Sequence, residues 1–325
     1  MMYIIILTLI SIILSITLGI ILIPSLRKSS RQVLSVYLSE KHKAKSNIPT
    51  MGGVIFIIPP ILLITLLLVF NKIKFSYNLL SVLFTFFSFG LIGFIDDFLI
   101  IKRHNNQGLS EFSKIVLEIV CATIIFYLFL KGNNEPLLWI HTINFKLNIG
   151  WLYGFFILLV LTSSSNAVNI TDGLDGLAGG LSVISFFTLG IITYNTGWLE
   201  GYMEITYFIF SLTGSLISFL LFNTYPAKIF MGDTGSLSLG ASLGIVAILS
   251  RHEVLLIVIG IVFVIETLTC IIQRIYYKFT KKRIFPITPI HHTFERYMPE
   301  VDVVKIFWIF GLVSALIALI FGVCL

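Results

Sequence analysis

The sequence predicts an all-α integral membrane protein that forms a single domain over residues 1–325. Hydrophobic residues make up 57% of the chain and charged residues only 12%, and the mean hydropathy is +1.00. Apolar runs of roughly 17 to 25 residues recur along the chain, the length that a helix needs to cross a hydrocarbon core of about 30 Å. Alternating segments of about ten residues, which are typical of a membrane β-barrel, are absent from the sequence.

Ten apolar runs are candidates for transmembrane helices. The first has no positive segment before it and no small-residue cleavage site after it, so we expect a retained span and not a signal peptide. The eighth is short, and its ends are the least well defined. The candidate spans are residues 2–26, 51–70, 77–101, 112–131, 150–166, 177–194, 205–222, 235–249, 254–276 and 304–325.

The charges between these spans predict the orientation of the chain in a cell membrane. Loops taken alternately place 17 of the 22 basic residues on one side. The positive-inside rule makes that side cytoplasmic and puts both termini outside. The basic surplus, a net charge of +6, is explained by this asymmetry and does not require nucleic acid as a partner.

Residues 166–180 carry polar groups between two apolar runs. Four of these side chains recur at every third residue, so a helical first half would hold them on one drifting face. They are Asn166, Asn169, Asp172 and Asp175. This face could bind a ligand, or the segment could be a polar interhelical turn in which Asp and Asn cap the next helix.

Asp96 and Asp97 stand together at the end of the third apolar run. A carboxylate near the centre of a membrane helix costs roughly 2.5–3.5 kcal/mol, and two carboxylates about 4 Å apart repel by about 4 kcal/mol at an effective dielectric near 20. A cation, protonation or angular separation on the helix would offset this cost. The alternative is a pair that points into interfacial water.

Residues 232–236, Gly-Asp-Thr-Gly-Ser, predict a tight turn that presents backbone N–H groups, a carboxylate and two hydroxyls together. These groups suit a phosphate and Mg²⁺, which prefers a few carboxylates plus substrate oxygens. The alternative is a helix N-terminus capped by Asp233 and Ser236.

Three further features are weaker when taken singly. Lys45 precedes a turn at residues 49–53 and could meet a phosphate, although cytoplasmic lysines are common topology signals. His291 and His292 lie among prolines and could bind metal, contact phosphate or be exposed. Glu266 falls deep in the ninth run and is expected to face a helix or a cavity.

All of these polar loops fall on the predicted cytoplasmic face. Carboxylates, amides and phosphate-binding turns on one face indicate an active site for Mg²⁺-dependent phosphoryl chemistry on a lipid substrate. A competing interpretation from another class is an ion-coupled transporter, which would place acids in broken, repeated helices near the midplane.

Five motifs occur in a fixed order between about residues 40 and 296. They are Pro-Thr-Met-Gly-Gly at 49–53, Phe-Ile-Asp-Asp at 94–97, Asn-Ala-Val-Asn-Ile-Thr-Asp-Gly-Leu-Asp-Gly-Leu-Ala at 166–178, Phe-Met-Gly-Asp-Thr-Gly-Ser at 230–236 and Pro-Ile-His-His-x-Phe-Glu at 289–295. This ordered set resembles the phospho-N-acetylmuramoyl-pentapeptide transferases of the polyprenyl-phosphate N-acetylhexosamine-1-phosphate transferase superfamily.

The resemblance implies a reaction, its substrates and a setting in the bacterial inner membrane. Phospho-MurNAc-pentapeptide would move from its UDP carrier to undecaprenyl phosphate, yielding lipid I and UMP for peptidoglycan synthesis, and hence for cell shape and division. The family also implies ten membrane helices, a cytoplasmic site, Mg²⁺ and usually a homodimer. A sister transferase that moves GlcNAc-1-phosphate is the nearest alternative.

The resemblance also implies residue roles. Asp233 would bind Mg²⁺ at the pyrophosphate, Asp96 and Asp97 would be the essential acidic pair, and one of them could deprotonate the acceptor phosphate. His291 and His292 would assist near the phosphates, and Phe230 would stack on uracil. The remaining residues expected to bind the UDP-sugar are Lys45, Asn166, Asn169, Asp172, Asp175, Asn223 and Gln273. The chain departs from the family at Thr293, where a third histidine is usual, and in the residues before Pro49, so Lys45 and Lys43 remain alternatives.

Overall fold

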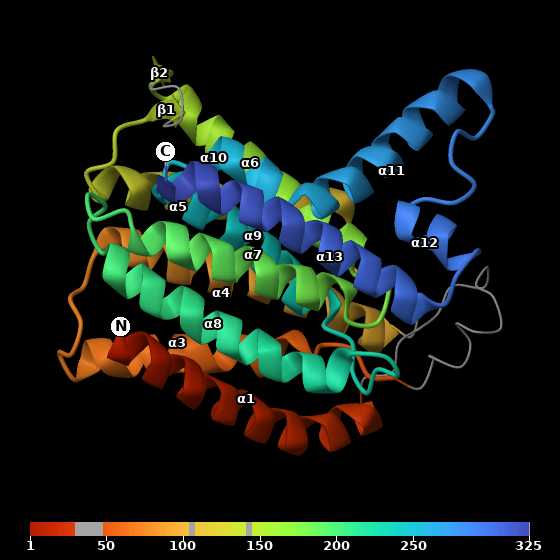
Figure 1. The fold of residues 1–325 in the computed structure, drawn as a ribbon, viewed down its shortest axis with the longest axis horizontal. Coiled ribbons are helices and arrows are strands. Elements are labelled where there is room, and N and C mark those ends of the chain that lie inside the picture. Colours follow the sequence, from red (N-terminus) through yellow and green to blue (C-terminus); the bar gives the residue numbers. More distant parts are fainter. Residues whose placement is uncertain (30–47, 104–107, 141–144, 325) are drawn as a thin grey trace.

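A computed structural model of the chain describes residues 1–29, 48–103, 108–140 and 145–324. Long helices stacked side by side form most of the molecule (Figure 1). The α-helices are α1 Met2–Ser29, α3 Gly53–Val69, α4 Tyr77–Arg103, α5 Glu111–Lys131, α6 Leu152–Thr171, α7 Leu177–Tyr194, α8 Tyr202–Asn223, α9 Gly232–Leu249, α10 Glu253–Ile259, α11 Ile261–Thr280, α12 Ile290–Glu295 and α13 Glu300–Leu319, which runs into a π-helix, η3 Ile320–Cys324.

The all-α membrane class is confirmed. Among the described residues, eight helices are long and apolar enough to cross a membrane, or nine if the bent pair α10 and α11 is one span. The helix α3 is also apolar but has only 17 residues, with Pro59 and Pro60 inside it. The ten predicted runs therefore all correspond to helical segments, while the structure supports a count of eight or nine full-length spans by length and composition.

The ninth predicted run, residues 254–276, differs most from its expected form. It was expected to be one span, but the structure divides it at Gly260 into α10 and α11, which meet at 86°. Gly260 lacks a side chain and is the C-cap of the first helix and the N-cap of the second, so the backbone can turn there. As a result, α11 and the following α12 lean out from the bundle (Figure 1).

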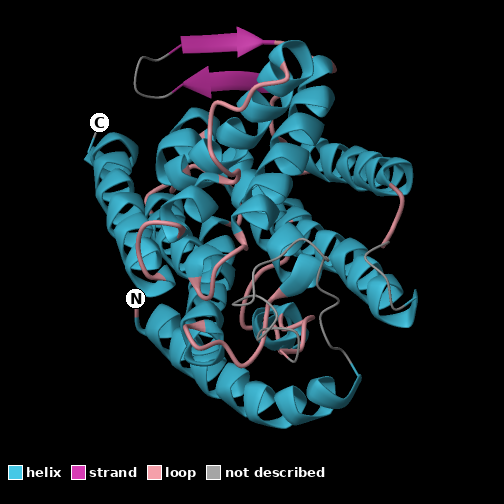
Figure 2. Cartoon of the chain, turned by 90° about the vertical axis from the view of Figure 1, so that its right-hand side faces the viewer, coloured by secondary structure: helices cyan, strands magenta, loops and turns pink. Residues whose placement is uncertain are grey.

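A two-stranded antiparallel sheet lies in the loop between α5 and α6 (Figure 2). Strand β1 Leu137–Ile140 pairs with β2 Phe145–Asn148, with Leu137 opposite Asn148. An all-α protein was the prediction from the sequence, so no strand was expected in this loop. Figure 1 places the hairpin at the end of the bundle that also holds both termini, whereas α12 lies toward the opposite end.

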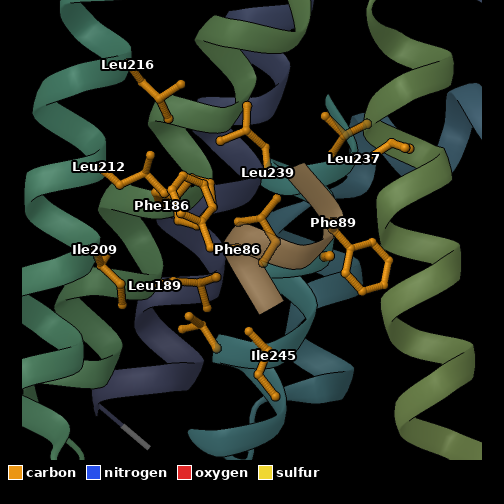
Figure 3. Close-up of a cluster of buried hydrophobic side chains, with 14 of the residues drawn as sticks. Phe86, Phe89, Phe186, Leu189, Ile209, Leu212, Leu216, Leu237, Leu239 and Ile245 are labelled. Atoms are coloured by element: carbon orange, nitrogen blue, oxygen red, sulfur yellow. The ribbon is translucent and has the colours of Figure 1, made fainter. Parts of the chain in front are cut away.

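The core is built around α9, of which 89% is buried, compared with 22% for α1. Apolar side chains of α4, α7, α8 and α9 interdigitate there, including Phe86, Phe186, Leu212 and Leu239 (Figure 3). Glycine permits the closest approaches, because a Cβ at Gly93 of α4 would overlap the carbonyl of Asp233. This approach brings the polar end of α4 against the first turn of α9.

Candidate active site

Asp97 caps the N-terminus of α9 from a neighbouring helix. Its Oδ1 accepts a hydrogen bond from the backbone N–H of Asp233 at 3.2 Å, and its Oδ2 accepts from the N–H and the hydroxyl of Thr234 at 3.0 and 2.7 Å. The first N–H groups of a helix have no partner within the helix, so an external carboxylate satisfies them and complements the helix dipole. Asp97 is buried, and its hydrogen bonds to the first turn of α9 fix the position of Asp233.

Lys114 of α5 links the two other acids of the cluster. Its ammonium lies 3.1 Å from Oδ2 of Asp96 and 3.0 Å from Oδ2 of Asp233. Asp96 is otherwise buried, and its Oδ1 accepts the backbone N–H of Leu109 at 2.6 Å. The ammonium offsets the repulsion between the carboxylates of Asp96 and Asp233.

In the sequence, Lys114 is only one of the basic residues that indicate the cytoplasmic side. A usable signal was its position at the end of the first turn of an apolar helix whose first residues are Glu111 and Phe112. Only the packing of α5 on α4 reveals that this lysine meets acids from two other helices.

The end of α6 completes one side of the cluster. The Asn169 amide donates to Oδ1 of Asp233 at 2.9 Å, as the predicted polar face requires. Asp172 follows directly as the C-cap of α6, and burial, together with the charges of Asp233, Asp97 and Asp175, raises the pKa of its carboxyl to about 8. Asn166 is exposed and donates to the Thr162 carbonyl of its own helix, so the structure does not bring it into this group.

Asp175 and Asn223 are buried and hold a loop. The carboxylate of Asp175 accepts the N–H of Ala227 at 2.9 Å, and its backbone N–H donates to Glu300 of α13 at 2.8 Å. The amide of Asn223 donates to the carbonyl of Ile229 at 2.9 Å. Both residues thus shape the segment that leads into Asp233, and their direct binding of substrate stays a prediction.

The motif at residues 49–53 lies beside the start of α9. The N–H of Phe230 donates to the carbonyl of Pro49, and the N–H groups of Gly52 and Gly53 donate to Phe230 and Met231, each at 2.9 Å. Phe230 is partly exposed beside these hydrogen bonds, and its stacking on uracil stays a prediction. Lys45 and Lys43 lie outside the described residues.

Gln273 of α11 holds the segment that connects α11 to α12. Its side-chain oxygen accepts the N–H groups of Ile284 and Phe285 at 3.0 and 3.1 Å, and its amide donates to the Phe285 carbonyl at 3.3 Å. All of these partners lie within the connecting segment, and a nucleotide contact stays a prediction.

The two predicted histidines have different surroundings. The His291 ring is fully buried, and its Nδ1 lies 3.1 Å from Glu266 of α11. The His292 ring is 24% exposed, with Nδ1 3.1 Å from Glu295. The pairing of Glu266 with His291 could not be predicted from the sequence, because the two residues are 25 positions apart.

The donor set fits a magnesium ion that shares its ligands with a substrate. In the described part of the chain, no group of three or more His, Cys, Asp or Glu side chains could hold a metal unaided. Asp96 and Asp233 nevertheless offer carboxylate oxygens to one cation, the Lys114 ammonium. Mg²⁺ favours one or two carboxylates with phosphate oxygens, so this pair suits it better than a metal that needs a full protein cage.

The comparisons with known proteins agree with this geometry. Residues 79–251 match the model of glycosyl transferase family 4, and residues 45–57 match signature 1 of phospho-N-acetylmuramoyl-pentapeptide-transferase. The proteins called phospho-N-acetylmuramoyl-pentapeptide-transferase in Halalkalibacterium halodurans and Bacillus subtilis are 40% and 38% identical to the chain, over 95% and 94% of its length and 94% and 93% of theirs. The namesake in Staphylococcus epidermidis is 41% identical, over 93% of this chain and 94% of its own.

The family model covers α4 through α9, the helices that carry Asp96, Asp97, Lys114, Asn169 and Asp233. The signature covers the turn that pairs with Phe230 and Met231. The matches to relatives extend over nearly the whole chain, including α11 and α12. The chain therefore belongs to the phospho-N-acetylmuramoyl-pentapeptide-transferase family of membrane transferases.

Proposed function

We propose that the protein transfers phospho-MurNAc-pentapeptide from UDP to undecaprenyl phosphate, yielding lipid I and UMP, at the cytoplasmic face of the bacterial cell membrane. The observation that carries this proposal is the meeting of Asp96, Asp233 and Lys114 at the N-terminus of α9. Carboxylates beside an ammonium and a helix N-terminus can hold a cation and the oxygens of a diphosphate together.

Asp233 and Asp96 would hold Mg²⁺. A bound Mg²⁺ supplies positive charge to the phosphate oxygens while the phosphodiester bond breaks. Lys114 is the residue of the chain that orients the diphosphate, because its ammonium already lies between the two acids. Asn169 keeps Asp233 in place from the opposite side.

The acceptor lipid would enter beside α11. A cavity of about 840 Å³ lies against this helix, lined by apolar residues such as Ile271 and Ile275 and by Arg274 and Arg283. Apolar walls suit a polyprenyl chain, and two guanidinium groups suit its phosphate. The 86° bend at Gly260 carries α11 out of the bundle, so a lipid could reach this cavity from the side.

Purified protein tests the reaction directly. In detergent with undecaprenyl phosphate and Mg²⁺, we expect release of UMP from UDP-MurNAc-pentapeptide and formation of a lipid-linked product. Lys114→Met should reduce this rate at least 100-fold, because the variant leaves two acids without their cation. Turnover of UDP-GlcNAc, with no turnover of the peptide substrate, would instead assign the chain to the sister reaction.

Orientation and assembly belong to the same proposal. We expect both termini outside the cell and the Lys114 cluster inside, as the distribution of basic residues indicates. We also expect a homodimer. Cysteine labelling from either side of intact cells, at positions near Met2 and near Lys282, would test the orientation.

A further inference from the structure

Glu118 is a buried acid in the apolar helix α5, and the reaction proposed above gives it no task. The residue is 6% exposed. It belongs to the buried stripe of α5, whose other members carry no charge: Cys121, Ala122, Ile125, Leu128 and Phe129. A charged side chain inside a membrane helix is costly, and such residues pair with another group or serve a function. The position of Glu118 therefore calls for a partner.

Lys114 is the cation whose charge acts on Glu118. The two residues are four positions apart on α5, so they are neighbours on one face of the helix. Helical side chains lean toward the N-terminus of their helix, which carries the Glu118 carboxyl toward Lys114. Within the described part of the chain, this carboxylate accepts no hydrogen bond and forms no ion pair. Glu118 is thus placed beside Lys114 but is not bound to it.

The Lys114 ammonium is held by the two acids that would bind the metal. It lies 3.1 Å from Oδ2 of Asp96 and 3.0 Å from Oδ2 of Asp233. Mg²⁺ would contact such oxygens at about 2.0–2.1 Å, and its charge repels an ammonium. The ammonium and Mg²⁺ therefore compete for the same two carboxylates, and the ammonium must move when the metal binds.

Glu118 offers the displaced ammonium a new partner. The lysine stem has four flexible carbons, so its Nζ atom can turn to a carboxylate one helical turn away without a change in the backbone. The other acid of α5, Glu111, lies three residues before Lys114, but it is exposed, and an ion pair in water contributes little. A buried carboxylate holds an ammonium more strongly, because the local dielectric is lower.

We propose that Glu118 is a positioning residue for metal binding: it takes over the Lys114 ammonium when Mg²⁺ binds the two aspartates. This inference rests on the proposed function for the presence of Mg²⁺ at Asp96 and Asp233. Held by Glu118, Lys114 stays at the edge of the cluster, where a remaining N–H can reach a phosphate oxygen. The buried acid thus lowers the free energy needed to displace the ammonium from the aspartates.

Metal affinity tests the proposal without relying on transfer activity. Mn²⁺ shares the preference of Mg²⁺ for carboxylates, and EPR distinguishes free from bound Mn²⁺. Purified protein would be titrated with Mn²⁺ in detergent at a fixed concentration of UMP. Glu118→Gln keeps the shape of the side chain but removes its charge, so we expect Mn²⁺ to bind about 10-fold more weakly. Glu111→Gln, the same change at the exposed acid of α5, is the matched control and should alter the affinity less than about twofold.

A second background separates positioning from a general effect of charge or folding. Lys114→Met has no ammonium to displace, so it should bind Mn²⁺ at least as tightly as wild type. Adding Glu118→Gln to this variant should change the affinity less than about twofold. An equal loss in both backgrounds, or an equal loss in Glu111→Gln, would overturn the inference, because Glu118 would then act without Lys114. Weaker Mn²⁺ binding by Lys114→Met alone would also overturn it, since the ammonium would not compete with the metal.

The transfer assay keeps the two proposals distinct. If the Mn²⁺ affinities follow this pattern but wild type transfers no phospho-sugar, the proposed function fails and the positioning role stands. If wild type is active and Glu118→Gln binds Mn²⁺ as tightly as Glu111→Gln does, the positioning role fails alone.

Discussion

Asp96 and Asp97 are neighbours in the chain, but their carboxylates have different partners. Both oxygens of Asp97 accept hydrogen bonds from the first turn of α9, whereas Oδ2 of Asp96 faces the ammonium of Lys114. An acceptor engaged by three donors is a poor base, because taking up a proton would break these bonds. Asp96 is therefore the better candidate for a direct role at the metal and the phosphates, and Asp97 for placing Asp233.

Asparagine substitutions should separate the two roles. Asp97→Asn places an amide N–H against backbone N–H donors. We therefore expect this variant to have a free energy of unfolding about 1–3 kcal/mol lower than wild type, and a lower activity. Asp96→Asn should abolish transfer and leave the melting temperature within a few degrees of wild type. Thermal unfolding in detergent, followed with the UMP-release assay, measures both. Equal destabilisation by the two changes would contradict this division.

Asp172 makes the site sensitive to pH. The pKa of its carboxyl, ordinarily 3.8, is raised to about 8, chiefly by burial. Between these values the folded protein holds a proton that the unfolded chain lacks, so this group lowers stability as pH rises toward 8. Asp172→Asn, which carries no ionisable group there, should show a flatter dependence of melting temperature on pH between 5 and 9, and parallel curves would refute the assignment.

At the scale of elements, helix positions follow from hydropathy, but the shape of a helix does not. Residues 254–276 have the apolar length of a span, and nothing in their composition distinguishes a straight helix from one bent at Gly260. The hairpin β1–β2 could not be predicted from the sequence either, because its four-residue strands show no clear alternation of apolar and polar residues. The bend at Gly260 and the hairpin both depend on contacts with other parts of the fold.

A buried polar network attaches this hairpin to the bundle. Arg251 donates to the carbonyls of Glu135 and Leu137 at 2.6 and 2.7 Å, and to the hydroxyl of Tyr153 at 3.3 Å. The same hydroxyl donates to Glu253 at 2.7 Å. Removing the guanidinium would leave the two carbonyls and the Tyr153 hydroxyl oxygen without this donor.

Arg251→Met should therefore destabilise the protein and leave the active site unchanged. We expect the free energy of unfolding to fall by about 2–4 kcal/mol, because buried hydrogen bonds to a charged group are lost. UMP affinity at the opposite end of the bundle should stay within about twofold of wild type. Chemical denaturation and calorimetry on the same preparation check both values, and a large loss of UMP affinity would show that the network reaches the site.

At the scale of the whole molecule, the loops that the sequence placed on one face do meet. Asp96, Asp97, Asn169 and Asp233 come together from three helices, as expected, while Asn166 does not join them. What the sequence could not predict is pairing over long separations. Lys114 and Asp233 are 119 residues apart, and either residue alone is explained by topology or capping.

On the proposed function, the two substrates would bind in two parts of one molecule. The Asp233 cluster offers carboxylates and one ammonium, which suits a metal-bound diphosphate. The cavity against α11 offers apolar walls and two arginines, which suits a lipid phosphate with no metal of its own. A reaction between the two ligands then needs only that their phosphates meet at the cytoplasmic end of α11.

Arginine substitutions in the cavity test this separation. Arg274→Gln and Arg283→Gln should each raise the KM for undecaprenyl phosphate about 5- to 10-fold, because a guanidinium–phosphate contact is lost, and should leave the KM for the UDP-sugar unchanged. Lys72→Gln, an exposed change near the opposite end of the bundle, is the control and should alter neither constant. Kinetics in mixed micelles, with each substrate varied in turn, measures both values. If either arginine variant raised the KM for the UDP-sugar instead, the cavity would belong to the nucleotide, and the lipid would have to approach the cluster from another side.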